Sequence, residues 1–552
     1  HGYGLVMASA TAKTSVGRPD FNLQQVPVQE NSDLELNRPQ LYFGEGLDSY
    51  VVTNTRRDEI DYEAGEQTET IVYDGADGVS VGGLVNRIAF SLRFADYNPL
   101  ISDLIGGDSR IHYIRDIRER AETLAPFLRF DSDPYPVVDD AGNVKWILDA
   151  YTVTDRFPYG EVADTNQISP ASGLDGSFNY IRNSVKAVVD AYDGSVDFYV
   201  IDDTDPIINA WRSAFPELFS DFADMPADLV DNIRYPEDLF RIQTNMWGRY
   251  HVANPTTFYN GNDAWNVALD PGDRVNTASP GIDPQTGEPL PVVAGKRVDP
   301  YYLLTELPGE QGAEFVMLRS FVPVGNDANQ LLTSFTVARS DPEHYGELIT
   351  YEMPRQDRPD GPALVGDSMQ SDGTVSDLQT QLGQRGSEVL LGNIIVVPVD
   401  DALVWVRPFY VKSDGVQVPE LEKVIVSFEG DVAVGDTLND ALGQLFDELP
   451  DVEEVVPDPD GDGSGDPDDP DAETPDPDEP DVSELSINEQ AARLLEEAND
   501  LYAQAQDALN AGDLGEYQAK NDEANAKVDD ALALLAPTTT TTTTTTVPDE
   551  ET

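Results

Sequence analysis

Cysteine is absent from this chain of 552 residues. That absence excludes disulfides, thiolate catalysis and metal centres with cysteine ligands. Histidine is scarce, and its scatter along the chain argues against a histidine-ligated metal site; the four residues are His1, His112, His251 and His344. We therefore expect no cofactor and no bound metal.

Long apolar runs are also missing. No window approaches the roughly 18 consecutive apolar residues that would indicate a transmembrane helix, and no signal peptide is visible. The chain begins at His1 without an initiator methionine, which favours a fragment of a longer protein. We expect the segment that directs the protein to its compartment to lie outside this sequence.

Basic residues are few. There are 34 lysines and arginines against 103 aspartates and glutamates, and the formal net charge is -69. Such a charge argues against nucleic acid or an anionic lipid surface as the partner of the fold. It fits a domain that faces water, cations or basic partners, and equally an adaptation to salt. The length predicts two or three folded units with linkers.

Residues 179–251 carry the densest local signals. Asn183 or Ser184 can cap a helix over 185–192, where Val185, Val188, Val189 and Tyr192 recur at helical spacing. The sequence also predicts a strand over 196–201, a helix that begins at Asp205-Pro206, and a helix that begins at Tyr235-Pro236 and stops at Asn254-Pro255. Its expected apolar stripe comprises Leu239, Ile242, Met246 and Tyr250.

Other segments predict a mixed fold. Residues 109–129 have a helical period and 146–153 alternate as a strand does. Further strands are expected at 314–322, 331–338, 389–399, 403–411 and 424–428, of which 389–399 reads as one strand buried on both faces. We predict an α+β domain, with a helix-bearing first half over 1–255 and a β-rich second half over 256–450.

The last hundred residues have a different composition. Residues 451–485 are rich in Asp, Glu, Pro and Gly and predict a disordered acidic linker. Residues 486–536 predict an αα-hairpin, which can dock on its own domain or on a partner, and 537–552 form a threonine-rich disordered tail. Within the linker, Asp458, Asp460, Asp462 and Gly463 resemble half of a calcium loop, but Asp469 stands where a bidentate Glu is usual. Loose cation condensation on the linker explains this run better than specific calcium binding does.

Polar residues near the densest stretch are the candidates for a ligand site. Paired carboxylates can act as acid and base when one has a raised pKa, and an arginine can hold an anionic group. The same residue types also serve as helix caps and buried ion pairs, and no spacing matches a catalytic motif. The candidates are Asp131, Asp133, Asp149, Tyr151, Tyr180, Arg182, Asn183, Arg234 and His251.

Several segments carry a family resemblance. They include NYIRNSVKAVVDAYDG at 179–194, RYPEDLF at 234–240, RPQLYFGE at 38–45, APFLRFDSDPYPVV at 125–138 and PVDDALVWVRPFYV at 398–411. In these segments the chain resembles uncharacterised protein family 0182, which comprises bacterial multi-pass membrane proteins with a large extracytoplasmic domain. The resemblance covers roughly residues 1–450 and the hairpin, and it brings no catalytic residues with it.

That resemblance implies a location and leaves the activity open. It implies attachment to the cell membrane through a transmembrane region that precedes this chain, with this part outside the cytoplasm. We expect envelope or membrane protein partners and no nucleic acid. Three hypotheses follow: a domain for binding, assembly or transport at the bacterial cell envelope, an envelope hydrolase or transferase that uses the carboxylate cluster, and a calcium-responsive module. The enzyme hypothesis requires Asp131, Asp133, Arg182 and His251 to converge in one pocket.

Overall fold

The computed structural model describes residues 2–30, 34–64, 67–75, 78–165, 167–174, 176–271, 296–310, 312–324, 330–356, 358–383, 387–399, 402–413, 418–446, 520 and 527. The chain divides into two compact units, His1–Asp451 and Val452–Thr552. Apart from Lys520 and Lys527, the predicted linker, hairpin and threonine tail lie outside the described residues, as does the calcium-like run. None of the helices in the described part is both long and apolar enough to cross a membrane.

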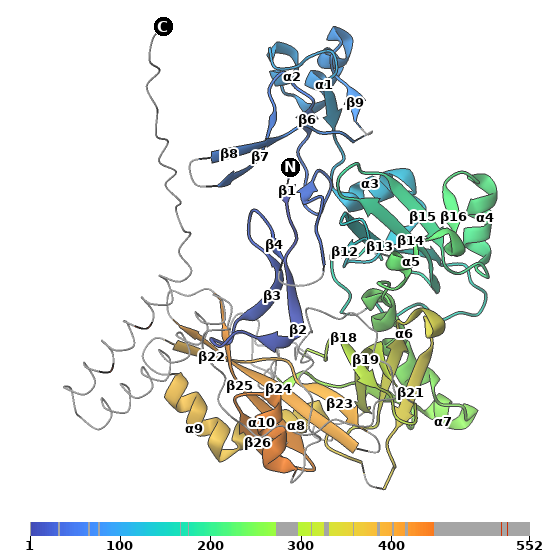
Figure 1. The fold of residues 1–552 in the computed structure, drawn as a ribbon. Helices are drawn as coiled ribbons and strands as arrows, with labels where there is room; N and C mark the ends of the chain where they lie inside the picture. The colour runs from blue at the N-terminus through green and yellow to red at the C-terminus, as the bar shows by residue number, and fades with distance from the viewer. Residues whose placement is uncertain are drawn as a thin grey trace, which may run out of the picture. The chain divides into compact units, whose positions relative to one another are not determined.

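The N-terminal 113 residues form small sheets (Figure 1). Strands β1 (Gly2–Tyr3) and β5 (Gln40–Leu41) pair, as do β7 (Glu59–Ala64) and β8 (Gln67–Ile71). One three-stranded sheet contains β2 (Met7–Lys13), β3 (Pro19–Gln24) and β4 (Gln29–Glu30). Another three-stranded sheet has the order β6 (Val51–Thr53), β10 (Arg110–His112), β9 (Val79–Ser80), and carries helices α1 (Leu84–Phe94) and α2 (Asn98–Ile101) over its own small core.

A six-stranded sheet forms the centre of the first half. Its order is β11 (Arg129–Phe130), β13 (Val144–Thr154), β14 (Tyr180–Asp190), β15 (Val196–Val200), β16 (Phe219–Asp221), with β12 (Tyr135–Val138) also on β13. Only the β15–β16 pair is parallel, and α4 (Pro206–Ala214) connects those two strands. Helices α3 (Ile117–Leu124) and α5 (Ala227–Val230) and the 3-10 turn η1 (Phe222–Asp224) complete this half.

The predicted helix over 185–192 is wrong, because this segment belongs to strand β14. The sheet is covered on both faces: Val185 and Val189 pack into one core cluster and Val188 into another. In a strand that is buried on both faces, valines can occur at any spacing. The helical spacing of these residues therefore does not indicate a helix. Ser184 does not cap a helix either, since its hydroxyl donates to Asp205 at 2.6 Å.

Two further predictions need correction. The helix expected over 109–129 is only α3, because Ile111 lies in strand β10 and Ile114 has a left-handed backbone with φ 54°. The single strand expected over 389–399 is two strands, β22 (Ser387–Leu391) and β23 (Ile395–Val399), which pair with different parts of β24 (Ala402–Ser413). Gly392 separates them where it packs against the ring of Pro408. The strand over 146–153 is confirmed as β13, although it is buried on both faces and does not alternate.

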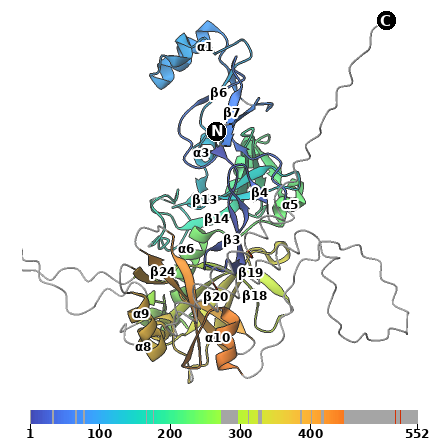
Figure 2. The ribbon, with the colours of Figure 1, turned by 60° about the vertical axis from the view of Figure 1, so that its left-hand side comes forward.

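Two five-stranded sheets build the second half (Figure 2). One has the order β17 (Trp265–Val267), β19 (Ala313–Pro323), β20 (Ser334–Arg339), β21 (Leu348–Glu352), with β18 (Tyr301–Glu306) also on β19. The other has the order β22 (Ser387–Leu391), β24 (Ala402–Ser413), β25 (Glu420–Phe428), β26 (Asp431–Gly435), with β23 (Ile395–Val399) on β24. The helical elements are α6 (Glu237–Tyr250), α7 (Pro255–Asn260), η3 (Pro342–His344), α8 (Pro362–Ser371), α9 (Gly373–Leu382) and α10 (Leu438–Leu445).

The fold class is α+β, as predicted. One large core lies between the two second-half sheets and the helices α8 and α9. Helix α6 joins the halves, because Tyr235, Leu239 and Phe240 share a core cluster with Tyr151 of β13 and Met317 of β19. The region where α6 meets both sheets therefore gathers residues that are distant in sequence, and it holds the candidate site.

Candidate functional site

A buried ion pair lies where the central sheet meets α6. Asp149 on β13 and Lys186 on β14 are direct cross-strand partners. Lys186 Nζ donates to Asp149 Oδ1 at 2.6 Å and to the carbonyl oxygen of Arg234 at 2.7 Å. The ring of Tyr345 covers the ammonium at 5.0 Å. Both charged side chains are closed off from water, at 0% and 3% exposure.

The buried carboxylates of Asp131 and Asp238 lie beside this pair. Asp131 Oδ2 accepts hydrogen bonds from the Tyr151 hydroxyl and from the backbone N–H of Asp238, the latter at 3.1 Å. Asp131 Oδ1 accepts from the backbone N–H of Asp133 at 3.0 Å. Burial, reinforced by the nearby negative charges of Asp238 and Asp149, raises the pKa of Asp131 to about 7.

Aromatic rings enclose the cluster. The guanidinium of Arg234 lies over the rings of Tyr135 and Tyr302, at 4.1 and 5.1 Å, and forms an ion pair with Asp133 at 2.7 Å. The Tyr302 hydroxyl donates to the carbonyl of Tyr235 at 2.7 Å. The cluster is thus a hydrogen-bonded charge network, and a substrate has no route to the buried carboxylates of Asp131 and Asp149 without local opening.

The raised pKa of Asp131 predicts a pH-dependent stability. An unfolded aspartate titrates near a pKa of about 3.9, so between roughly pH 4 and 7 the folded state holds a proton that the unfolded state has lost. The free energy of unfolding contributed by this group is therefore greatest at low pH and falls as pH rises through 7. Asp131→Asn removes the titration of this group, so the free energy of unfolding of wild type minus that of the variant should decrease from pH 5 to pH 8.

Urea denaturation at several pH values measures this gap. Asp133→Asn is the matched control, because its carboxylate lies two residues away and is half exposed. Parallel pH profiles for wild type and Asp131→Asn would show that Asp131 is ionised in the folded state throughout this range.

Tyr180 and Arg182 belong to a second network. Asp205 caps α4 by accepting from Ile207 N at 2.9 Å, and its carboxylate also accepts from the hydroxyls of Tyr180 at 2.7 Å and Ser184 at 2.6 Å. Arg182 forms an ion pair with Asp202 at 2.7 Å. These contacts fix the turn between β15 and α4.

The remaining candidates lie apart from these networks. His251 follows α6 and stacks on Trp265, with ring centroids 3.4 Å apart. Asn183 accepts from the Tyr345 hydroxyl at 3.1 Å and lies at the rim of the ion-pair cluster. The structure brings Asp131, Asp133, Asp149, Tyr151 and Arg234 together, but it does not place Arg182 or His251 with them in one pocket. The convergence that acid–base chemistry would require is not present among these residues.

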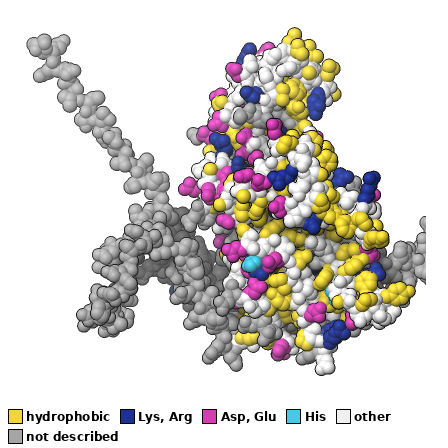
Figure 3. All heavy atoms as spheres, turned by 90° about the vertical axis from the view of Figure 1, so that its right-hand side faces the viewer, with side chains coloured by type: hydrophobic (Ala, Val, Ile, Leu, Met, Phe, Trp, Pro, Cys, Tyr) yellow, Lys and Arg dark blue, Asp and Glu magenta, His cyan; other side chains and the backbone are white. Residues whose placement is uncertain are grey.

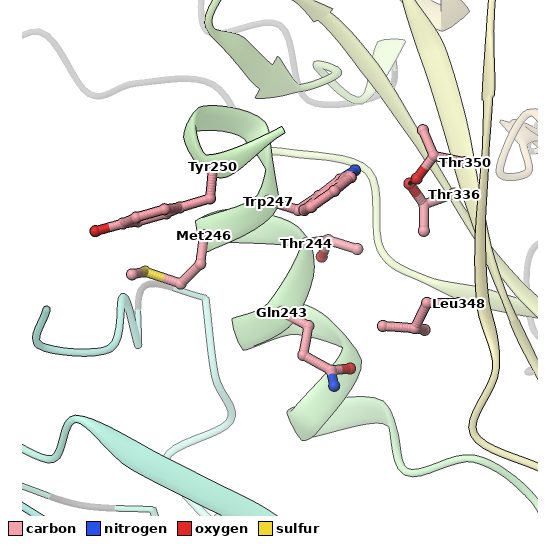
Figure 4. A pocket seen from close by; sticks show the side chains of 8 residues that line it. All are labelled: Gln243, Thr244, Met246, Trp247, Tyr250, Thr336, Leu348 and Thr350. Carbon is pink, nitrogen blue, oxygen red and sulfur yellow. Dashed lines mark hydrogen bonds between the residues drawn. The ribbon is translucent and has the colours of Figure 1, made fainter. Parts of the chain in front are cut away.

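The concave surface in this region is a cleft along one face of α6, which sequence reasoning missed. Its apolar end encloses about 410 Å³ and is lined by α6 on one side and by strands β20 and β21 on the other, as Figure 4 shows. The lining residues are Gln243, Thr244, Met246, Trp247, Tyr250, Thr336, Leu348 and Thr350. Trp247 and Leu348 are 40% and 43% exposed although both are strongly apolar.

A polar cavity of about 590 Å³ adjoins the apolar end, and Gln243 lines both. Its walls come from the N-terminal end of β14, the β15–α4 turn and the Tyr345-Gly346 turn. The polar side chains in these walls are Arg182, Asn183, Asp202, Asp203 and Thr204. The stripe from Leu239 to Tyr250 spans roughly 16 Å at the α-helical rise of 1.5 Å per residue. We call the two cavities together the α6 cleft.

Two features hold α6 in place behind the cleft. Gly248 lies so close to β17 that a Cβ atom there would be 2.4 Å from the Trp265 carbonyl oxygen. The buried guanidinium of Arg319 donates to Thr244 Oγ1 at 2.9 Å and to Asn245 Oδ1 at 3.1 Å. The position of α6 at the cleft is therefore set by contacts with β17 and with Arg319 of β19.

The sequence predicted part of the cleft lining on α6. The predicted apolar stripe of α6 is real, but only Leu239 and Ile242 are fully buried. Met246 is partly buried and Tyr250 is exposed, and both line the cleft. Helical spacing identifies the apolar face of a helix. It does not show which part of that face the rest of the protein covers.

No cluster of three or more histidine, aspartate or glutamate side chains suited to a metal ion occurs in the part of the chain that the structure describes. The calcium-like run from Asp458 lies outside that part.

Comparison with known proteins identifies relatives along nearly the whole chain. The model of "Uncharacterised protein family (UPF0182)" matches residues 1–382. A "UPF0182 protein" of Desulforamulus reducens is 36% identical over 94% of this chain and 51% of its own length. Those of Pelotomaculum thermopropionicum and Methanospirillum hungatei are 37% and 35% identical over 94% of this chain, covering 51% and 52% of their own lengths. This chain thus spans about half the length of these relatives, and no solved structure matches it.

Proposed function

The chain belongs to uncharacterised protein family UPF0182, and from that premise we propose that it is the extracytoplasmic domain of a multi-pass membrane protein. In this proposal the domain acts by binding at the cell envelope, and the α6 cleft is its ligand site. The ligand is an amphiphile with an uncharged, hydroxyl-rich head and an apolar tail.

The observation that carries the proposal is the contrast between the two ends of the α6 cleft. At one end Trp247, Met246 and Leu348 form an apolar surface that the fold itself leaves open to solvent. Exposed aromatic side chains in a concave site are typical of ligand contacts. An aliphatic tail that covered these side chains would remove their apolar surface from water, at about 25 cal/mol per Å².

The polar end suits a hydroxyl-rich head. Arg182 offers donors, while Asp203 and Thr204 offer acceptors, so the wall can bond to groups that both donate and accept. Arg182 is already paired with Asp202 at 2.7 Å, which leaves little net positive charge for an anionic head. Sugar-like hydroxyls match this mixed lining better than a phosphate or a carboxylate does.

The burial and the contacts of the carboxylates support binding rather than catalysis. Asp131 and Asp149 are buried behind Tyr345 and Tyr302 and already hold hydrogen-bond partners. Asp202 and Asp205 hold the β15–α4 turn. The raised pKa of Asp131 suits the hydrolase or transferase alternative, but the burial of this carboxylate away from the α6 cleft supports binding instead.

The test uses octyl glucoside, below its micelle concentration, as the probe amphiphile. Saturable quenching or enhancement of Trp247 fluorescence is expected in the wild type, and Trp247→Phe identifies which part of the signal comes from this residue. Leu348→Asp should weaken binding about tenfold, equivalent to about 1.4 kcal/mol, because it puts a charge against the tail.

Leu304→Asp is the matched control, because Leu304 is an exposed leucine on β18 and lies outside the cleft lining. It should leave binding unchanged. Equal weakening by Leu348→Asp and Leu304→Asp, or a non-saturable wild-type titration, would refute the α6 cleft as the ligand site.

A further inference from the structure

Exposed apolar side chains gather at one end of the first unit, on residues 78–113, which we call the tip. In Figure 3 hydrophobic side chains cover much of the upper end of the molecule. The largest contributions come from α1 and from the segment that follows it: Val85 and Leu92 are 79% and 78% exposed, and Leu84 and Ile101 are 66% and 62% exposed. Single exposed leucines are ordinary, but a contiguous group marks an interaction surface.

Helix α1 is apolar on two opposite faces. Phe90 and Phe94 face inward, where Phe90 is buried in the small tip core and Phe94 stacks on Tyr50 with ring centroids 4.7 Å apart. Leu84, Ile88 and Leu92 recur every four residues on the other side, and this face is exposed. One face of α1 thus packs on the core of the tip, and the second face is exposed and has no covering among the described residues of the first unit.

The tip differs from the rest of this acidic chain in charge. Helix α1 contains Arg87 and Arg93 and no acidic residue. Over the whole tip, arginine and aspartate balance: Arg87, Arg93 and Arg110 stand against Asp96, Asp103 and Asp108. A chain of net charge -69 therefore presents its exposed apolar face on a locally neutral surface, with cations on the same helix.

The arginines are held in place by the tip itself. Arg87 donates to the carbonyl oxygen of Ser102 at 3.4 Å and also to that of Ile105, which ties α1 to the segment after α2. The guanidinium of Arg93 lies 4.8 Å from the ring centroid of Tyr113. Exposed Tyr97 follows the helix, and aromatic side chains of this kind favour the boundary between lipid and water.

We propose that the tip docks on a phospholipid bilayer, with the exposed face of α1 and the neighbouring Ile101 entering the headgroup region and the exposed Arg93 facing lipid phosphates. Short helices with an apolar face and basic flanks lie in the plane of the membrane in this way. The inference deepens the envelope location proposed above and rests on it. It gives the domain a second membrane contact besides a transmembrane anchor, and so would fix its orientation over the bilayer.

A second copy of this chain is a less suitable occupant of the same face. Two chains that each carry a net charge of -69 repel one another as they approach, whereas a bilayer offers a fluid apolar layer that adapts to the irregular tip. Self-association is nevertheless an outcome that the experiment below separates from lipid binding.

The absence of cysteine makes the test direct, because one introduced cysteine is the only labelling site. Leu92→Cys at the tip and Leu304→Cys on β18 are each labelled with a fluorophore that responds to polarity. Vesicles of phosphatidylcholine, with and without phosphatidylglycerol, are then added to the full chain. We expect a blue shift and higher intensity at position 92 with phosphatidylcholine vesicles, a weaker response when phosphatidylglycerol is present because the net charge of -69 opposes an anionic surface, and no change at position 304.

A second substitution tests the face itself. Val85→Asp in the labelled Leu92→Cys chain should reduce the vesicle signal at least tenfold at equal lipid, since a charge on the helix face opposes insertion. Val85 is exposed, so the unfolding midpoint should not change. An unshifted signal at position 92, an equal shift at position 304, or a shift that grows with protein concentration without vesicles would overturn the proposal, the last by assigning the face to a second copy.

The location is tested separately in intact cells that produce the Leu304→Cys protein, with the protein lacking this substitution as control. A membrane-impermeant maleimide should label the variant only. Labelling in cells without vesicle binding would contradict the tip proposal and would still support the extracytoplasmic location. Absence of labelling until the cells are opened would instead contradict the location.

Discussion

Lys186→Met is expected to lower the free energy of unfolding by about 3–5 kcal/mol, because it leaves the buried carboxylate of Asp149 without its cation. Lys186 Nζ also donates to the carbonyl oxygen of Arg234, so the substitution removes a second hydrogen bond in the same buried volume. Methionine is close in length to lysine and keeps the packing. The loss of stability therefore reflects the unpaired charge of Asp149 more than a cavity left by the lysine side chain.

Urea denaturation of the single and double variants measures this effect. Asp149→Leu combined with Lys186→Met should recover more than half of the loss, since an apolar pair often replaces a buried ion pair at little cost. Lys423→Met is the control, because Lys423 pairs with an exposed Asp436 on the surface and such pairs contribute less than about 1 kcal/mol. If Lys186→Met were as mild as Lys423→Met, the buried pair would not be a structural charge pair.

The buried pair also shows where sequence reasoning stopped. Asp149, Asp131 and Arg234 were selected from the sequence as polar residues near a dense stretch, and the structure places them together. Lys186 was not selected, although it is the one charge inside the apolar run from Val185 to Val189. A lone charge in such a run is a usable signal for a buried ion pair, but its partner lies 37 residues away and comes only from strand pairing.

Local signals predicted elements well where the deciding contacts are local. Asp205 followed by Pro206 begins α4 as expected, and its carboxylate accepts from the backbone of Ile207. The start of α6 at Glu237 after Tyr235-Pro236 is also as expected, although no side chain caps this helix. The strand over 196–201 and those over 314–322, 403–411 and 424–428 are likewise confirmed.

Local sequence signals gave wrong predictions where contacts with distant parts of the chain determine the structure. Val185 to Val189 fits a helix by spacing and a strand by burial, and only the two covering layers choose the strand. The α6 cleft could not be predicted for the same reason. Trp247 and Leu348 become its walls only when α6 lies beside β21, and neither residue stands out in the sequence.

Gly248→Ala is expected to destabilise the protein by about 1–3 kcal/mol, against the usual preference of helices for alanine. The added Cβ would lie 2.4 Å from the carbonyl oxygen of Trp265, which is backbone and cannot rotate away. Helix α6 or strand β17 must move apart, and the shift is transmitted to the opposite face of α6. Affinity for octyl glucoside should therefore fall together with stability.

Gly373→Ala supplies the matched control for this substitution. Gly373 begins helix α9, and nothing lies within 4 Å of a Cβ atom at that position. There the loss of backbone freedom in the unfolded chain should stabilise the protein by about 0.4–1 kcal/mol. Opposite signs in urea denaturation would show that α6 is held against β17 by contact at Gly248. If both substitutions stabilised the protein, α6 would be free to shift, and the width of the cleft would be set by its walls at β20 and β21 instead.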